Sequence, residues 1–351
     1  MNLIRKPLLL SSVATALCFS NAMMAQAEQL KVVTSFSILK DMVEQVAGDE
    51  AVVSSLVGRN GDTHFFSPSP SDAKLLKDSE LLVINGLEFE GWITRLIEAS
   101  GFEGMTVVAT DGAVLLSNEE HDDHDDNDDH DEDEHHGEDE HHDADEHAGH
   151  DHHDHGEFDP HTWQSLSRGA VYVQNISAAL QTARPEAADA LASRAAAYIA
   201  DLNALDTKLK AEFSAIDQHC RTIVTSHDAF QYFGADYGLN FVAPQGWSTA
   251  SEASARDVAS LIEQIDEGGI AGIFVENIVD ARLVDQIASE TGLGFGGVLY
   301  SGALSETDGP AATYLTMIEH NAEQILSALQ AAEASGACEH HDDDDHDDDH
   351  G

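Results

Sequence analysis

Three histidines stand apart from the others, each in a loop or just after an expected strand. His64 lies in "GDTHFF", His161 in "DPHTW" and His227 in "TSHDAF". Ligand sites of α/β sheets form outside the carboxyl ends of strands, and neutral imidazole is a common metal ligand. A lone histidine more often makes an ordinary hydrogen bond, as we expect for His219 and His320. From the residues alone, a metal site and ordinary structural roles both stay open.

A second group of histidines lies in the segment from His121 to Glu157, which has no Lys, no Arg and no aliphatic side chain larger than Ala. Such a segment is expected to be disordered and solvated, and to hold several metal ions weakly. It would raise the local metal concentration near a site and lose affinity when its imidazoles are protonated at acidic pH. Its histidines are His121, His124, His130, His135, His136, His141, His142, His147, His150, His152, His153 and His155.

The formal net charge of −50 is concentrated in two tracts. Of the 66 acidic residues, 21 lie between Glu119 and Glu157, and 8 lie in the C-terminal tail from Glu339 to Asp349. The tail repeats the His/Asp composition and is expected to be a second metal-gathering segment. Such acidity excludes nucleic acid as a partner, because a phosphate backbone requires basic contacts.

Residues 1–27 read as a secretory signal. A basic start, "MNLIRK", precedes an apolar stretch from Pro7 to about Phe19 and an A-x-A cleavage site at Ala25–Ala27. This stretch is too short and wrongly flanked for a membrane span. Cys18 raises the alternative of a lipid anchor, but it follows Leu17 where lipid attachment requires a small residue. The expectation is an exported chain.

Two cysteines remain after the leader, Cys220 and Cys338. In an oxidising compartment they predict one disulfide that closes a long loop, with two free thiols as the alternative. Zinc ligation by these cysteines is not expected, because nothing near them has C-x-x-C spacing.

Apolar runs of strand length alternate with helical patterns on both sides of the acidic tract, which predicts βα units on mostly parallel sheets. The expected strands are 31–34, 51–53, 81–86 and 105–109 in the first half, and 221–225, 241–244, 272–276 and 296–300 in the second. The expected helices include 38–47, 165–181, 254–267, 281–291 and 309–332.

Between the halves, an Ala-rich pattern runs from Pro185 to about Ile216 and predicts one helix of some 32 residues, about 48 Å long. The predicted architecture is therefore α/β, with two lobes joined by a long helix. Its divisions are a signal peptide at 1–27, an N-terminal lobe at 28–184 with a disordered loop at 117–157, a linking helix at 185–216, a C-terminal lobe at 217–335 and a tail at 336–351.

Three ordered motifs carry a resemblance to a known family. "GDTHFFSPSPSDAKLL" (61–76), "DPHTW" (159–163) and "TSHDAFQYFGADYGL" (225–239) resemble the ZnuA-like zinc-binding periplasmic proteins of ABC-type metal importers. A His/Asp-rich loop between the first and second metal histidines is a hallmark of that group. The resemblance covers essentially the whole mature chain. It implies two α/β lobes linked by a rigid helix, with metal held in the interlobe cleft by His64 and His161 from the first lobe and His227 from the second.

The resemblance also bears on which metal is bound. Manganese-selective relatives tend to carry a carboxylate where this sequence has His227. Imidazole suits Zn²⁺, whereas Mn²⁺ favours oxygen ligands, so Zn²⁺ is expected as the transported ligand, with manganese or another divalent metal as the alternative. Many members supply an acidic fourth ligand from the stretch at 299–305, which holds no carboxylate here, and others from the residue before the first histidine, here Thr63. We expect water or a side chain of the His-rich loop instead.

Two other functions compete with metal import. Three imidazoles with an open position also describe a catalytic zinc, so a zinc metalloenzyme is one alternative. Against it, the sequence has no H-E-x-x-H and no nucleophile elbow, and we expect no paired carboxylates around these histidines. A secreted zinc buffer is the other, although buffering needs only a tract. The resemblance implies a non-enzymatic monomer of the periplasm that delivers zinc to a membrane permease driven by an ATPase, with a metallochaperone as a further candidate partner.

Overall fold

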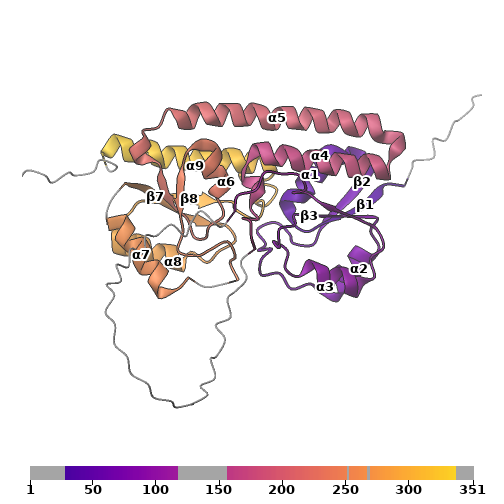
Figure 1. Cartoon of the computed structure of the whole chain (residues 1–351), viewed down its shortest axis with the longest axis horizontal. Coiled ribbons are helices and arrows are strands. Elements are labelled where there is room, and N and C mark those ends of the chain that lie inside the picture. The colour runs from indigo at the N-terminus through magenta and orange to yellow at the C-terminus, as the bar shows by residue number, and fades with distance from the viewer. Residues whose placement is uncertain (1–27, 118–155, 251–252, 267–268, 337–351) are drawn as a thin grey trace, which may run out of the picture.

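The computed structural model describes residues 28–117, 156–250, 253–266 and 269–336. Two α/β lobes lie side by side beneath a long helix that spans both of them (Figure 1). The predicted signal peptide, the twelve histidines of the tract, and the C-terminal tail with Cys338 fall outside the described residues.

One member of the predicted disulfide, Cys220, is described. It is buried, with 3% of its surface exposed, and its pairing with Cys338 stays a prediction. Among the described residues, no helix is long and apolar enough to cross a membrane.

The N-terminal lobe is built on a four-stranded parallel sheet in the order β2-β1-β3-β4. Its strands are β1 (Leu30–Thr34), β2 (Ala51–Ser55), β3 (Leu81–Ile84) and β4 (Met105–Val108). The central strands β1 and β3 are almost continuously buried, because helices cover both faces of the sheet. Helices α1 (Ser37–Ala47) and α4 (Leu166–Ala183) lie on the side of the long helix, and α2 (Pro70–Lys77) and α3 (Ile93–Ser100) lie on the other (Figure 1).

The C-terminal lobe repeats this plan with the order β6-β5-β7-β8. Its strands are β5 (Thr222–Val224), β6 (Asn240–Val242), β7 (Ile270–Glu276) and β8 (Phe295–Leu299). Helix α9 (Tyr314–Ser335) packs on β7 and β8, and α7 (Ala255–Asp266) and α8 (Arg282–Thr291) lie on the opposite side (Figure 1). Helix α6 (Gln231–Tyr237), which follows β5, is short and was not among the predicted helices.

The long helix is shorter than the sequence predicted. Pro185–Ala187 form a 3₁₀ turn, and the α-helix α5 runs over Ala188–Ser214, which is 27 residues or about 40 Å. The predicted 32 residues were wrong because Ala187, at φ −103° and ψ 3°, leaves helical geometry, and the chain turns again after Ser214. Helix α5 contacts α1 and α4 of one lobe and α6 and α9 of the other, so it still joins the two lobes as predicted.

The last helix also begins later than predicted. The expected range 309–332 placed Gly309 and Pro310 in the first turn, whereas α9 begins at Tyr314. Thr313 and Thr316 form a reciprocal capping box, in which each side chain accepts from the other residue's backbone N–H. That cap sets the start of the helix and leaves the preceding residues as a loop.

The start of α9 is fastened to the N-terminal lobe. The backbone N–H of Tyr314 donates to Asp41 Oδ2 of α1 at 2.8 Å, and the Tyr314 hydroxyl donates to the carbonyl of Trp163 at 2.5 Å. Gly169 of α4 allows this approach, because a Cβ there would lie 2.5 Å from the Tyr314 hydroxyl oxygen. The helix that covers the second sheet is therefore held in place by the first lobe.

Replacing Gly169 with Ala should lower the free energy of unfolding by roughly 1–2 kcal/mol. Ala favours a helix by about 0.5–1 kcal/mol over Gly, but the forced contact with Tyr314 costs more. Urea denaturation followed by circular dichroism measures the change. In a Tyr314→Phe background, which lacks the hydroxyl, the same substitution should cost less. An equal or larger cost there would show that the Tyr314 contact does not govern this position.

Candidate metal centre

His64 lies in a loop that follows β2, and its backbone is fixed by the preceding aspartate. The backbone N–H of His64 donates to Asp62 Oδ1 at 2.9 Å, a local turn that Asp readily forms. Behind it, the Trp92 indole N–H donates to the carbonyl of Thr63 at 2.9 Å. The imidazole meets the ring of Phe89 edge-on, with centroids 4.7 Å apart. The loop therefore presents the His64 ring in one orientation.

His161 lies at the point where the chain enters the short 3₁₀ helix Thr162–Gln164 that leads into α4. Asp159 Oδ1 accepts both from the His161 backbone N–H at 2.9 Å and from its Nδ1 at 2.8 Å. The neighbouring Trp163 donates its indole N–H to the carbonyl of Ser301, which lies just after β8 in the second lobe. His161 is thereby held at the seam where the two lobes meet.

His227 follows β5 and is oriented by the end of the neighbouring strand β7. Its backbone N–H donates to Glu276 Oε1 at 2.8 Å, and its Nδ1 lies 2.5 Å from Glu276 Oε2. Both side chains are fully buried. With the ring proton on the nitrogen that faces the carboxylate, the Nε2 lone pair is left to face away from Glu276.

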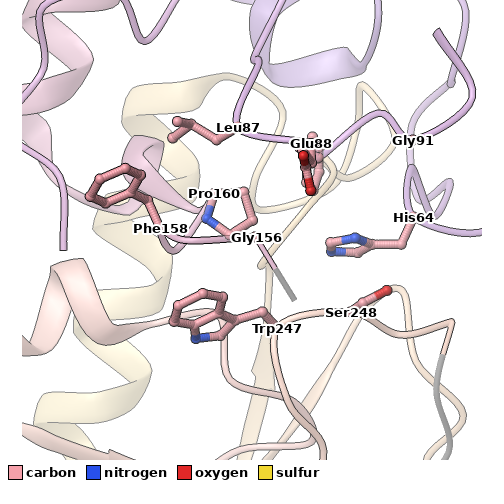
Figure 2. Close-up of a pocket in the computed structure, with 10 residues that line it drawn as sticks. His64, Leu87, Glu88, Gly91, Gly156, Phe158, Pro160, Trp247 and Ser248 are labelled. Carbon is pink, nitrogen blue, oxygen red and sulfur yellow. The ribbon is translucent and has the colours of Figure 1, made fainter. Parts of the chain in front are cut away.

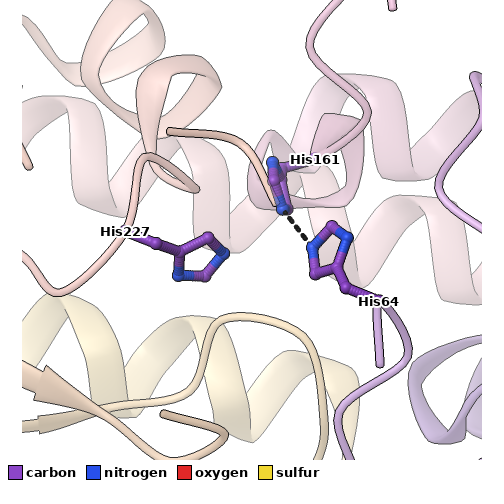
Figure 3. A group of neighbouring side chains, drawn as sticks. All are labelled: His64, His161 and His227. Atoms are coloured by element: carbon purple, nitrogen blue, oxygen red, sulfur yellow. Dashed lines mark hydrogen bonds between the residues drawn. The ribbon is translucent and has the colours of Figure 1, made fainter. Parts of the chain in front are cut away.

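The three histidines converge at one point, as Figure 3 shows. Each can offer a ring nitrogen within 4.8 Å of the others, and the Nε2 atoms of His64 and His161 lie 3.3 Å apart. His161 and His227 are 1% and 0% exposed, whereas His64 is only partly buried. Among the described residues this is the only such group of histidine, cysteine or carboxylate side chains. The structure thus brings together the three residues that the sequence singled out.

The donor set fits a metal ion. His227 Nε2 is buried and has no hydrogen-bond partner among the described residues, which is costly for a polar atom unless something else engages it. Three imidazole nitrogens that face one another cannot all satisfy one another by hydrogen bonding. A cation at their centre would accept all three lone pairs.

The protonation state of the histidines also favours the binding of a cation. Burial, together with the nearness of the other two histidines, holds the pKa of His64 well below its usual range. Burial and the charge of His227 do the same for the pKa of His161, against a smaller opposing effect of Glu276. Burial would lower the pKa of His227 as well, but the Glu276 carboxylate outweighs it and raises that pKa. His64 and His161 are therefore neutral, the form that binds metals.

The expectation that no paired carboxylates surround these histidines was wrong. Asp159 contacts His161, and Glu276 contacts His227. Burial raises the pKa of Asp159 to about 7; burial also acts to raise the pKa of Glu276, but the contact with His227 outweighs it and lowers that pKa. Asp159 was visible two positions before His161. Glu276 had a weaker signal, since it is an acidic residue that ends an apolar strand 49 positions away from its partner.

The remaining site predictions have simpler outcomes. His219 is exposed, and His320 contacts the carbonyl of Val298 through its Nε2 at 3.1 Å, so neither belongs to the cluster. The stretch 299–305 supplies the buried Ser301 and no carboxylate. The expected water or loop side chain as fourth ligand stays a prediction, and the histidines of the tract lie outside the described residues.

Comparison with known proteins places the chain in a family. The family model described as the periplasmic component A of the zinc-uptake complex matches residues 32–328. The chain belongs to this ZnuA family. Its members are solute-binding components of ABC transporters, which work with a permease and an ATPase. The chain is thus a metal-binding solute-binding protein and not an enzyme.

Proteins that are similar to this chain are named for different metals. The chain is 29% identical to the iron-binding protein YfeA of Yersinia pestis, over 90% of this chain and 91% of that protein. It is 29% identical to the manganese-binding lipoprotein MntA of Bacillus subtilis, over 86% and 90%. The solved periplasmic zinc-binding protein TroA of Treponema pallidum superposes with a TM-score of 0.71 at 25% identity, covering 86% and 99%. The names of these relatives therefore do not fix which metal this chain binds.

Replacing Glu276 with Gln should weaken the tightest metal site about 10–100-fold, the usual effect of losing a carboxylate that orients a ligating imidazole. Gln keeps the shape and one acceptor oxygen but removes the charge beside His227 Nδ1. Isothermal titration measures the affinity, and the exposed Glu98→Gln serves as the control. Unchanged affinity in Glu276→Gln would show that the carboxylate does not support the binding of metal by His227.

Proposed function

We propose that this ZnuA-family protein captures Zn²⁺ through His64, His161 and His227 and delivers it to the permease of an ABC importer. The observation that carries the proposal is the convergence of three imidazole nitrogens without a carboxylate among them. Nitrogen donors suit Zn²⁺, and hard oxygen donors suit Mn²⁺. The two carboxylates nearby face the outer Nδ1 atoms of His161 and His227, not the centre.

The charges around the centre support a doubly charged cargo. A buried cation is costly unless opposite charge lies close to it. Asp159 and Glu276 are both buried, at 0% and 1% exposure, and each contacts a different ligand. A cation nearby favours the ionised form of both carboxyl groups, so their two negative charges would balance a divalent ion while the imidazoles bind it directly. Capture and release then need no covalent chemistry.

We infer that the His-rich segment gathers zinc beside this centre. The described chain leaves at Ser117 and returns at Gly156, and Ser117 pairs with Phe158 in an isolated antiparallel bridge. Gly156 and Phe158 line the same pocket as His64. Ions held by the twelve histidines between these points would be concentrated near the centre, because a tether keeps them within its reach.

The predicted divisions of the chain complete the proposal. The protein would be exported to the periplasm by the signal at residues 1–27. There its two lobes and the joining helix would present the metal centre to the permease. Attachment through Cys18 is the alternative, and relatives such as MntA carry the word lipoprotein in their names. The disulfide between Cys220 and Cys338 would fasten the tail to the second lobe.

The metal assignment is tested by single replacements of the three histidines. Ala at position 64, 161 or 227 should weaken the tightest Zn²⁺ site by more than the about 10–100-fold that a lost outer partner costs, because a direct ligand is removed. Isothermal titration with a competing chelator gives the affinity, and the exposed His219→Ala is the control.

The same titration separates zinc from manganese. The unmodified protein should bind Zn²⁺ more tightly than Mn²⁺, as expected for three nitrogen donors. Tighter binding of Mn²⁺, or a tight Zn²⁺ site that survives all three replacements, contradicts the proposed centre.

The role of the His-rich segment is tested by removing residues 119–155 and joining the ends with a short Gly/Ser linker, which keeps Ser117 and Phe158. One tight zinc site should remain and several weaker sites should disappear, since the tight ligands lie elsewhere. A variant that keeps the segment but carries Asn at its twelve histidines separates the effect of imidazole from that of length and charge. Loss of the tight site in either variant would mean that the segment supplies one of its ligands.

A further inference from the structure

One pocket leads from the surface to the histidine cluster. It has a volume of about 190 Å³ and is lined by His64, by Glu88 and its neighbours, by Phe158 and Pro160, and by Trp247 and Ser248. Of the three histidines only His64 lines it, in keeping with the burial of the other two. Figure 2 shows Glu88 and His64 on one side of the opening and Trp247 and Ser248 on the other.

The two sides of the pocket belong to different lobes and are tied together. Thr249 Oγ1 donates to Asp62 Oδ2 at 2.6 Å, which links the loop of Trp247 to the loop of His64. The Trp247 indole N–H donates to Asp228 Oδ2 at 3.1 Å, next to His227. The pocket is thus a defined passage whose walls are anchored close to two of the three histidines.

Among the described residues that line this pocket, Glu88 alone has an acidic side chain. The other lining residues are mostly apolar or glycine, and low-dielectric walls strengthen the field of a charge at the mouth of a cleft. A Cβ added to Gly156 would lie 3.5 Å from Glu88 Oε2, so the carboxylate lies where the His-rich segment rejoins the described chain. The next residue, Phe89, contacts the ring of His64. Glu88 therefore lines the same pocket as that rejoining point and His64.

The backbone at Glu88 is held in an unusual conformation. Gly86, Leu87 and Glu88 have φ values of 90°, 53° and 60°, in the left-handed region that only glycine adopts freely. The buried carboxylate of Glu90 closes the turn by accepting from the backbone N–H of Asn85 at 2.7 Å and of Gly86 at 3.2 Å. Non-glycine residues persist in this region only when their surroundings enforce it, which occurs often at functional sites.

We propose that Glu88 is a positioning residue for metal uptake, which attracts the divalent cation into this pocket and passes it to His64. The inference rests on the proposed function in taking His64 as a metal ligand. Glu88 lies outside the group of converging nitrogens, so it acts on the rate at which an ion arrives and not as a permanent ligand. A fixed carboxylate at the mouth lowers the free energy of a cation in the passage, and added salt screens that effect.

The test compares Glu88→Asn with Glu88→Asp in the full chain. Asn and Asp have the same size and both tolerate left-handed backbone, so the pair differs only in charge, and both retain the His-rich segment. Stopped-flow tryptophan fluorescence on mixing with Zn²⁺ follows binding, because Trp163 lies next to His161 with ring centroids 5.2 Å apart. Glu98→Gln, an exposed replacement on α3, is the control.

At low ionic strength Glu88→Asn should slow association about tenfold, the lower end of electrostatic focusing by a cleft. Glu88→Asp should keep most of the rate of the unmodified protein, and the gap should narrow as salt is added. Equal rates in the two variants overturn the proposal, as does a gap that salt leaves unchanged, since that would indicate a structural role.

A parallel measurement on His64→Ala separates the two proposals. If His64→Ala keeps the tight site, the proposed metal centre fails. If His64→Ala loses the tight site while Glu88→Asn binds at the rate of the unmodified protein, only the role of Glu88 fails.

Discussion

The contact between Glu276 and His227 is the interaction on which the rest of the centre depends. A carboxylate buried at the end of β7 would be strongly destabilising without a partner, and the imidazole at the end of β5 is that partner. Their pairing fixes the ring of His227 and turns its second nitrogen toward the other lobe. Asp159 does the same for His161. Each of these two buried carboxyl groups is stabilised by the imidazole that it contacts, and the same contact orients that imidazole.

The three histidines of the candidate centre come from both lobes, so the position of one lobe relative to the other is itself part of the site. Helix α5 contacts both lobes, and the start of α9 is bonded to Asp41 and Trp163 of the first lobe. Ser301, just beyond β8, accepts hydrogen bonds from Trp163 and Gln164, beside His161. The bonds from Trp163 and Gln164 lie within a few residues of His161, so they tie the second lobe to the first beside the candidate centre.

Much of this arrangement could be predicted from sequence. The strands of both lobes were predicted to within a few residues because fully covered parallel strands form short apolar runs. The three histidines were predicted from their positions after strands and from their motifs. The bounds of α5 and α9 were wrong because an Ala-rich run does not show where the backbone leaves helical geometry, and because the capping box at Thr313 sets the start of α9. Glu276 was missed because its role comes from a neighbour in the sheet that is distant in sequence.

The turn at Glu88 could not have been predicted for a related reason. Nothing in "NGLEFE" indicates that Leu87 and Glu88 adopt left-handed backbone, because that conformation depends on hydrogen bonds to Glu90. Non-glycine residues such as Leu and Glu rarely adopt a positive φ, so their local preferences predict ordinary right-handed or extended backbone here. Sequence patterns therefore identify the histidines that lie together in this candidate centre better than they identify the pocket beside them.

The unequal burial of the three histidines has a consequence for exchange. His161 and His227 are enclosed and contact carboxylates, whereas His64 is only partly buried and borders the pocket. An ion held by all three would have two ligands fixed on the inside and one at the solvent boundary. Its coordination shell could then be replaced one position at a time from the outside, so that the cargo never has to pass through a bare, unligated state.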